Sequence, residues 1–324
     1  MNLRLGIVGA GAMGAKVAAG ADRIGGVRVT AVVDRDQDRA RSLAGAHQAR
    51  PYADIAGLAA SGEVDAVYIG VPHDQHLAAC TEAAAVGLHA LIDKPLCNTL
   101  DEAQRIIEAR DAAGVQLMVG FSYRFRAEWL RAREFVAAGL IGTPRLVTDT
   151  LIEADSNTPA WYWKATAGGG VLQLQSHHCF DRLAWILGDD FEKIGCQVTQ
   201  FPGSAEDVAI INAATSGGTL VSIDIGYGRR YSARARPTTV IQGDRGHIVI
   251  DQHRVISIET EDGTRQEFDC SADDWLLSEL SAFTGLCTGS TAAVPSAEDG
   301  RAALECALAS AESARAGGSL VRIR

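Results

Sequence analysis

Short apolar runs alternate with alanine-rich stretches through the first 120 residues of the chain. The apolar runs predict strands at Leu3–Val8, Val27–Val33, Val64–Val71, Leu88–Ile92 and Val115–Val119. The stretches between them predict helices at Met13–Ile24, Arg35–Leu43, Asp74–Val86 and Leu100–Ala113. Strands that are apolar on both faces are typical of a parallel sheet covered by helices, and right-handed crossovers then produce a doubly wound α/β domain. We assign residues 1–121 to this domain.

The pattern changes in residues 122–324. A helix predicted at Ala127–Ala138 is followed by an extended run and by a second helix around His177–Leu187. Between Phe191 and Phe268 strand-like runs are joined by short connections that contain Gly and Asp, which is typical of antiparallel hairpins. Two helices and a short final strand complete the chain. This part is therefore expected to be an α+β domain with a large, mostly antiparallel open sheet.

Composition excludes several classes of protein. Hydrophobic residues make up 47% and charged residues 22% of the chain, which is ordinary for a globular protein and excludes a disordered one. The net charge of −10 argues against nucleic-acid binding. There is no apolar run long enough for a membrane span or a signal peptide, so we expect a cytoplasmic protein with no membrane partner. The seven scattered cysteines form no CxxC pair and imply neither a disulfide framework nor a metal site.

A glycine-rich segment follows the first predicted strand and opens the first predicted helix. It reads G-x-G-x-x-G, in which the first glycine allows a tight turn, the second lets the backbone approach a pyrophosphate, and the third allows close helix packing. The helix N-terminus supplies N–H groups for the phosphates. We expect this segment to bind a dinucleotide through Gly9, Gly11, Ala12, Met13 and Gly14.

Two charged residues bear on the choice of dinucleotide. Asp34 ends the second predicted strand, where a carboxylate accepts hydrogen bonds from the adenosine ribose hydroxyls and repels a 2′-phosphate. This position favours NAD. Arg35 could stack on adenine or pair with a 2′-phosphate, so NADP stays open as a second cofactor.

The tripeptide Asp93-Lys94-Pro95 follows another predicted strand. In open α/β sheets ligands bind beyond the carboxyl ends of the strands, which is where Lys94 is expected. The chain has only four lysines, at positions 16, 94, 164 and 193, while arginine is abundant. A lysine retained in such a chain is more often needed for its chemistry, because its amine can lose a proton and a guanidinium cannot.

With these motifs the sequence resembles the Gfo/Idh/MocA oxidoreductases, the glucose–fructose oxidoreductase and inositol dehydrogenase group. The family has Glu-Lys-Pro where this chain has Asp93-Lys94-Pro95. Other similar segments are Asp65–His76, Gly120–Phe125, Ile141–Pro144, Gly168–Leu172 with His178 and Asp181, and Pro295–Gly300. The resemblance spans nearly the whole chain. It implies an N-terminal Rossmann domain, an NAD(P) cofactor, a small polyhydroxylated substrate, and a homodimer or homotetramer.

The resemblance also implies roles for particular residues. Lys94 and His178 are expected to be catalytic, with His178 taking the hydroxyl proton and Lys94 hydrogen-bonding the reacting oxygen. We place His178 at a helix start, where the helix dipole favours its neutral form. Further cofactor contacts are expected from Val71, Pro72, His73, His76, Asp93 and Lys94, and substrate contacts from Tyr123, Arg124, Trp161, Lys164, His177 and His178.

One position departs from the family pattern. Family members usually carry Asp four residues before the histidine, whereas this chain has Leu174 before His178. Three functions therefore stay open: a dehydrogenase acting on CH–OH groups, an enzyme that holds NAD tightly and uses transient oxidation for elimination or hydrolysis, and a non-catalytic NAD-binding sensor.

Overall fold

The computed structural model describes residues 2–153, 162, 164, 169–200, 205–227 and 237–323 of the chain. Contacts between residues divide it into two units. The first comprises Met1–Ser122 with Asp274–Arg301, and the second comprises Tyr123–Asp273 with Ala302–Arg324. The sequence led us to expect a single crossing between domains after residue 121; in the structure a later segment returns to the first unit.

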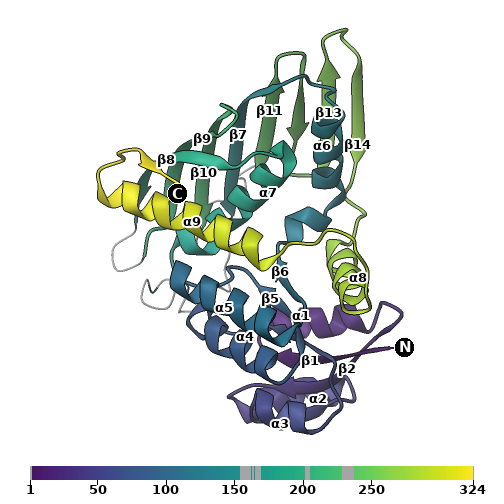
Figure 1. Cartoon of the computed structure of the whole chain (residues 1–324). Coiled ribbons are helices and arrows are strands. Elements are labelled where there is room, and N and C mark those ends of the chain that lie inside the picture. Colours follow the sequence, from purple (N-terminus) through teal and green to yellow (C-terminus); the bar gives the residue numbers. More distant parts are fainter. Residues whose placement is uncertain are drawn as a thin grey trace. The chain divides into compact units, whose positions relative to one another are not determined.

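The first unit is built on a six-stranded parallel sheet in the order β3-β2-β1-β4-β5-β6 (Figure 1). Its strands are β1 (Leu3–Val8), β2 (Val27–Val33), β3 (Arg50–Tyr52), β4 (Ala66–Ile69), β5 (His89–Asp93) and β6 (Leu117–Gly120). Its helices are α1 (Ala12–Ala21), α2 (Gln37–Ala46), α3 (Ile55–Ala60), α4 (His76–Ala85), α5 (Leu100–Ala113) and α8 (Trp275–Cys287). The doubly wound fold is confirmed. The strand order reverses between β1 and β4, where such sheets bind their ligands.

The sequence analysis did not predict two elements of this unit. Strand β3 has three residues, and helix α3 has six. Both are too short to produce a clear apolar period, and β3 lies at the edge of the sheet. The interior strands are easier to recognise because Ile7, Val32 and Val67 have no exposed surface.

Helix α5 begins with hydrogen bonds that fix the end of the loop after β5. The side chain of Thr99 accepts a hydrogen bond from the N–H of Glu102, and the Glu102 carboxylate accepts one from the N–H of Thr99. This capping box stabilises the helix start. The same carboxylate accepts a hydrogen bond from the N–H of Asn98, and so holds the connection between β5 and α5.

The second unit contains a nine-stranded sheet in the order β14-β13-β12-β11-β7-β10-β9-β8-β15. Its strands are β7 (Pro144–Glu153), β8 (Phe191–Thr199), β9 (Val208–Thr215), β10 (Leu220–Tyr227), β11 (Thr238–Gly243), β12 (Gly246–Ile250), β13 (Val255–Thr260), β14 (Arg265–Asp269) and β15 (Val321–Arg322). Strands β7 and β10 pair in parallel and the other neighbours are antiparallel. The predicted, mostly antiparallel sheet is confirmed.

The two faces of this sheet differ. Helices α6 (Ala127–Ala137), α7 (His177–Leu187) and α9 (Ala297–Arg315) lie in front of it in Figure 1. On β10, Val221 is buried while its neighbour Leu220 is 59% exposed. Leu220 pairs in register with Leu146 of β7, which is also exposed, so the two side chains share one face. The outer face thus carries large apolar side chains.

A buried ion pair fixes α7 to the sheet. Arg182 of α7 donates a hydrogen bond to Asp149 of β7, and both side chains are almost completely buried. Asp149 also accepts a hydrogen bond from the hydroxyl of Thr239 on β11. The guanidinium of Arg182 stacks on the rings of Tyr123 and Trp129, with centroid distances of 4.4 Å and 4.7 Å. These contacts set the position of α7.

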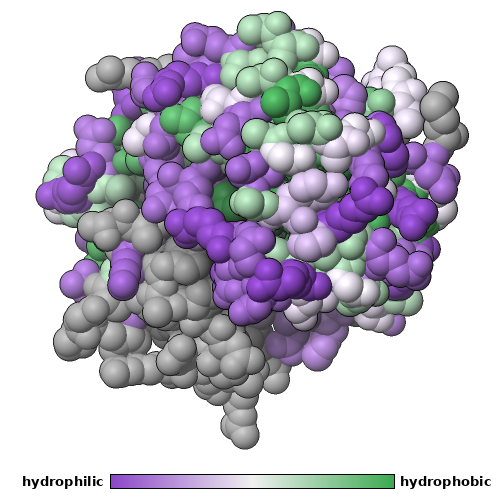
Figure 2. Space-filling model, turned by 90° about the horizontal axis from the view of Figure 1, so that it is seen from below, coloured by the Kyte–Doolittle hydropathy of each residue, from purple (hydrophilic) through white to green (hydrophobic). Residues whose placement is uncertain are grey.

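Among the described residues, none of the helices combines the length and the apolar character needed to cross a membrane. Figure 2 shows one face of the molecule, on which polar residues surround small apolar patches.

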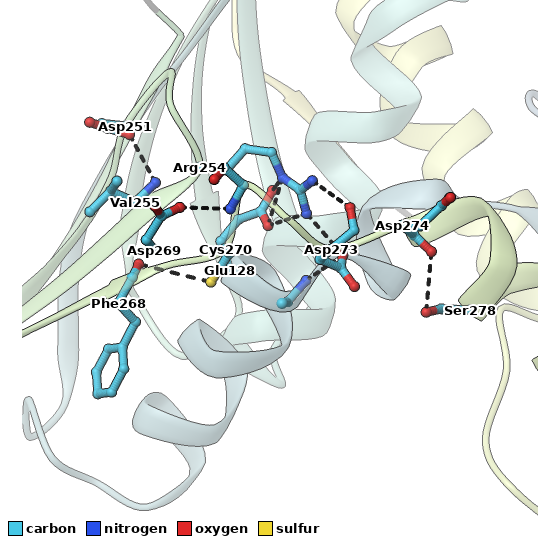
Figure 3. Close-up of polar contacts among 12 residues, drawn as sticks. Glu128, Asp251, Arg254, Val255, Phe268, Asp269, Cys270, Asp273, Asp274 and Ser278 are labelled. Carbon is cyan, nitrogen blue, oxygen red and sulfur yellow. Dashed lines mark hydrogen bonds and ion pairs between the residues drawn. The ribbon is translucent and has the colours of Figure 1, made fainter.

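A second arginine anchors the start of α6. Arg254 donates hydrogen bonds from Nε to both carboxylate oxygens of Glu128, at 3.0 Å and 3.1 Å. Its Nη1 and Nη2 atoms donate to the carbonyl and the carboxylate of Asp273 (Figure 3). Glu128 is 1% exposed, so removing Arg254 would leave a buried carboxylate without its cation.

We expect Arg254→Met to lower the free energy of unfolding by about 2–4 kcal/mol, because it leaves the Glu128 carboxylate buried without its cation. Chemical denaturation measures this. The matched control is Arg145→Met, since Arg145 pairs with Asp244 at an exposed site and its loss should cost less than about 1 kcal/mol. Equal losses in the two variants would contradict the role given to Arg254.

Candidate functional site

The glycine-rich loop between β1 and α1 has the geometry of a dinucleotide site. Gly9 has φ +103°, and a Cβ there would lie 2.4 Å from the carbonyl oxygen of Gly70. A Cβ at Gly14 would lie 2.0 Å from the carbonyl oxygen of Gly9, so the helix packs directly on the loop. A Cβ at Gly11 would meet nothing within 4 Å. Open space therefore faces the loop where α1 begins at Ala12, as pyrophosphate binding requires.

Asp34 lies at the end of β2 beside this loop. It is 9% exposed, and its Oδ2 atom accepts a hydrogen bond from the N–H of Ala10 at 2.8 Å. Its Oδ1 atom accepts hydrogen bonds from the N–H of Asp36 and from Nη2 of Arg39, at 2.8 Å and 2.9 Å. A carboxylate has about four acceptor positions, so it can still accept ribose hydroxyls. These residues fit the adenosine half of NAD.

Arg39 was missed by the sequence reading, which considered Arg35 instead. Both arginines are exposed, and Arg39 reaches from the first turn of α2 to the Asp34 carboxylate. Its guanidinium lies beside the group that distinguishes a 2′-hydroxyl from a 2′-phosphate. The available signal was the spacing, since a residue one helical turn beyond the cap at Asp36 can point back at the strand end.

We expect Arg39→Met to lower the affinity for NADPH relative to NADH by about tenfold, because a phosphate would lose a charged partner. Dissociation constants come from the fluorescence of the bound reduced cofactor. Arg41→Met is the matched control, since Arg41 is as exposed as Arg39 and pairs with Asp38. If the ratio of NADPH to NADH affinity changed in Arg35→Met and not in Arg39→Met, Arg35 would be the residue that pairs with the 2′-phosphate.

The connection that follows β4 carries four of the predicted cofactor residues. Val71 and Pro72 are partly exposed, and His73 is buried at the start of a short 3-10 helix. His76 has no exposed surface. Its Nδ1 and Nε2 atoms lie 2.8 Å and 2.9 Å from the carbonyl oxygens of Pro95 and Val71. The direct cofactor contact expected of His76 is therefore replaced by an internal one: its side chain supports the loop from within.

Lys94 follows β5, on the edge of the sheet where the glycine loop also lies. Its side chain is partly exposed, and its N–H donates a hydrogen bond to Oδ1 of Asp93 at 2.9 Å. The peptide bond between Lys94 and Pro95 is cis. Burial raises the pKa of the Asp93 carboxyl above its usual range, and the nearby charges of Lys94 and His76 oppose that rise. A cation and a carboxyl thus lie next to each other at this edge.

The helix that carries the two adjacent histidines begins earlier than the sequence suggested. A π-helix spans Leu172–Ser176 and runs directly into α7, and Val171 before it is also helical. His178 therefore lies inside a continuous helical run. The expectation that a helix N-terminus favours its neutral form is wrong, because the dipole acts over the first turn only. A π-helical turn inside a helix is frequently found at functional sites.

The two histidines have different surroundings. His177 is fully buried, and its Nε2 atom lies 2.8 Å from the side-chain oxygen of Gln173. His178 is partly exposed, and its ring packs on that of Tyr123 with a centroid distance of 4.9 Å. Of the two, His178 is the one with surface available to a ligand.

Leu174 occupies the position of the family's usual Asp and is 2% exposed. The polar groups near it come from its neighbours in the π-helix. Gln173 contacts His177, and Gln175 donates a 3.3 Å hydrogen bond to Glu153 at the end of β7. The sequence analysis did not predict Glu153 near this helix, because strand β7 brings it there only in the folded sheet.

The predicted substrate residues Tyr123 and Arg124 both have partners within the second unit. Arg124 donates hydrogen bonds to Asp181, at 2.6 Å from its Nη2 atom. Tyr123 is 8% exposed and packs edge-on against Trp129. Burial raises the pKa of Tyr123 above its usual value, so its hydroxyl stays protonated at neutral pH.

The other predicted substrate residues add less. Lys164 is exposed, and Trp161 lies outside the described residues. In the part of the chain that the structure describes, no group of three or more His, Cys, Asp or Glu side chains is arranged to hold a metal ion.

Comparisons with known proteins agree with this geometry. Residues 3–121 match the Gfo/Idh/MocA model described as an oxidoreductase family with an NAD-binding Rossmann fold, and residues 129–249 match the C-terminal domain of that family. Inositol 2-dehydrogenase 3 of Saccharopolyspora erythraea is 28% identical over 98% of this chain and 94% of its own.

Solved structures agree in fold. The crystal structure of a putative myo-inositol dehydrogenase from Sinorhizobium meliloti has a TM-score of 0.86 at 23% identity, with both chains covered completely. Levoglucosan dehydrogenase, in complex with NADH and levoglucosan, has a TM-score of 0.88 at 20% identity, again over the whole of both chains.

Proposed function

Since the chain belongs to the Gfo/Idh/MocA family of NAD-binding oxidoreductases, we propose that it transfers a hydride between nicotinamide and a hydroxyl-bearing carbon of a sugar, inositol or related polyol. The observation that carries the proposal is the partly exposed Lys94 at the carboxyl edge of a sheet whose glycine loop and Asp34 fit a dinucleotide. Relatives named as inositol and levoglucosan dehydrogenases support the substrate class.

In this proposal a bound dinucleotide would supply the hydride acceptor or donor, and the protein orients and polarises the substrate. In the oxidation direction the hydroxyl proton passes to the imidazole of His178 as the carbon–hydrogen bond breaks. The ammonium group of Lys94 donates a hydrogen bond to the same oxygen and stabilises the negative charge that develops on it.

The remaining predicted residues have supporting roles. The protonated hydroxyl of Tyr123 hydrogen-bonds the substrate beside His178. Arg124 supports the site through its ion pair with Asp181, and His177 supports it through its contact with Gln173. Lys164 and Trp161 remain proposed substrate contacts.

We expect Lys94→Met and His178→Asn each to lower kcat by about 10²- to 10³-fold, the usual effect of losing one oxyanion donor or one general base. Reduction of NAD+ and NADP+ is followed at 340 nm in a panel of inositols, aldoses, sugar acids and amino sugars. Lys193→Met is the control, because Lys193 forms an exposed ion pair with Glu192. Undiminished turnover in both variants would exclude the proposed roles.

A second function is considered because the buried Leu174 occupies the position where the family usually has Asp. An enzyme that holds NAD tightly and oxidises its substrate only transiently would release no NADH, so the panel would show no net reduction. Cofactor that stays bound through purification would favour that function. With loosely bound cofactor and no turnover, the sensor function would be favoured, and Leu174→Asp would be the variant in which to look for restored activity.

We also propose that the chain forms a homodimer or homotetramer through the outer face of the second unit's sheet, which carries Leu146, Ile210 and Leu220. Large apolar side chains on one sheet face are typical of an interface. Leu220→Glu should reduce the mass measured by light scattering to that of a monomer. Leu130→Glu on α6 is the control, and an unchanged mass in both would exclude this face.

A further inference from the structure

The imidazole of His76 joins two connections at the carboxyl edge of the parallel sheet. Its Nε2 atom lies 2.9 Å from the carbonyl oxygen of Val71, in the connection between β4 and α4, and the histidine itself is the first residue of α4. Its Nδ1 atom lies 2.8 Å from the carbonyl oxygen of Pro95, in the connection after β5. The ring is fully buried and packs edge-on against the ring of His73, which limits its rotation.

These contacts surround the backbone of Lys94. The N–H of Lys94 is held by the carboxylate of Asp93, and the carbonyl of the following residue, Pro95, is held by His76. Beyond Pro95 the loop is fixed again where the N–H of Asn98 donates to Glu102 of α5. The backbone that carries the Lys94 side chain is thus tethered on both sides within a few residues.

The two contacts of the ring have different consequences. A neutral imidazole carries one N–H donor, and only the protonated ring can donate to both carbonyl oxygens. The contact with Val71 joins the first residue of α4 to a residue five positions earlier, so it stabilises that turn alone. The contact with Pro95 joins residues 19 positions apart, and it is the one that connects α4 to the loop of Lys94.

We propose that His76 is a positioning residue, whose hydrogen bond from Nδ1 to the carbonyl oxygen of Pro95 holds the Lys94 ammonium group where the reaction needs it. This rests on the proposed function, in which Lys94 polarises the reacting oxygen. A displacement of about 1 Å in a catalytic group can cost about 100-fold in rate, so a single backbone hydrogen bond behind Lys94 is enough to matter.

Two conservative variants separate the contacts. The side-chain nitrogen of Asn lies near the position of histidine Nδ1, and that of Gln lies near Nε2. We expect His76→Asn to keep the bond to Pro95 and to retain kcat within about threefold, and His76→Gln to lower kcat by about tenfold or more. Both should show similar losses of thermal stability, because each keeps one of the two contacts of the ring.

The control pair is His89→Asn and His89→Gln, because His89 accepts a hydrogen bond from the N–H of Gln116 on the same unit and lies at the opposite end of β5 from Lys94. Both control variants should retain kcat. Equal kcat in the two His76 variants, or better rescue by Gln, would overturn the proposal.

A second measurement needs no substrate. Reductive methylation followed by mass spectrometry reports the reactivity of each of the four lysines separately. The rate at Lys94 should change by about threefold or more in His76→Gln and stay near the original in His76→Asn, with Lys16, Lys164 and Lys193 as internal references. If the unaltered protein has no dehydrogenase activity, the proposed function fails while this labelling still decides the role of His76. Identical Lys94 rates in all three proteins would overturn it.

Discussion

All strands of a parallel sheet end at the same edge, and the chemistry of the first unit depends on that constraint. Because the strand order reverses between β1 and β4, the connections on either side diverge there and leave room for a ligand. The glycine loop after β1, Asp34 after β2 and Lys94 after β5 therefore gather along one edge, although Gly9 and Lys94 are 85 positions apart in the sequence. Local contacts then refine each connection, as Ala10 does for Asp34 and His76 does for the Lys94 loop.

The second unit reaches its arrangement by a different route. Helix α7 is held to the sheet by the ion pair of Arg182 with Asp149, buried beneath the rings of Tyr123 and Trp129. The π-helical turn that precedes α7 sets which side chains face the sheet, and it leaves His177 buried and His178 partly exposed. A buried ion pair of this kind adds little net stability, but a buried charge without its partner costs several kcal/mol. Any other position of α7 would separate Arg182 from Asp149, so the pair disfavours such positions.

Much of the fold was predictable because it depends on patterns that extend over ten or more residues. The β-α alternation and the place of the G-x-G-x-x-G loop between β1 and α1 were predicted correctly from spacing alone. The short β3 and α3 were missed because three and six residues carry too little periodicity. His178 was placed at a helix start because the glycine-rich segment before it resembles a loop, whereas the backbone from Val171 onward is already helical.

The sequence by itself determined the class of each unit, the dinucleotide loop and the residue types available for chemistry, because these follow from periodicity and from covalent structure. Only the tertiary structure decided which groups are partners. Glu153 beside Gln175 and Pro95 beside His76 meet through helix and strand packing, and each of these hydrogen bonds joins positions whose separation in the sequence carries no signal of contact. Burial also changed the interpretation of His76. The sequence analysis expected its imidazole to contact the cofactor, whereas in the structure neither ring nitrogen faces solvent and the ring supports the loop from inside.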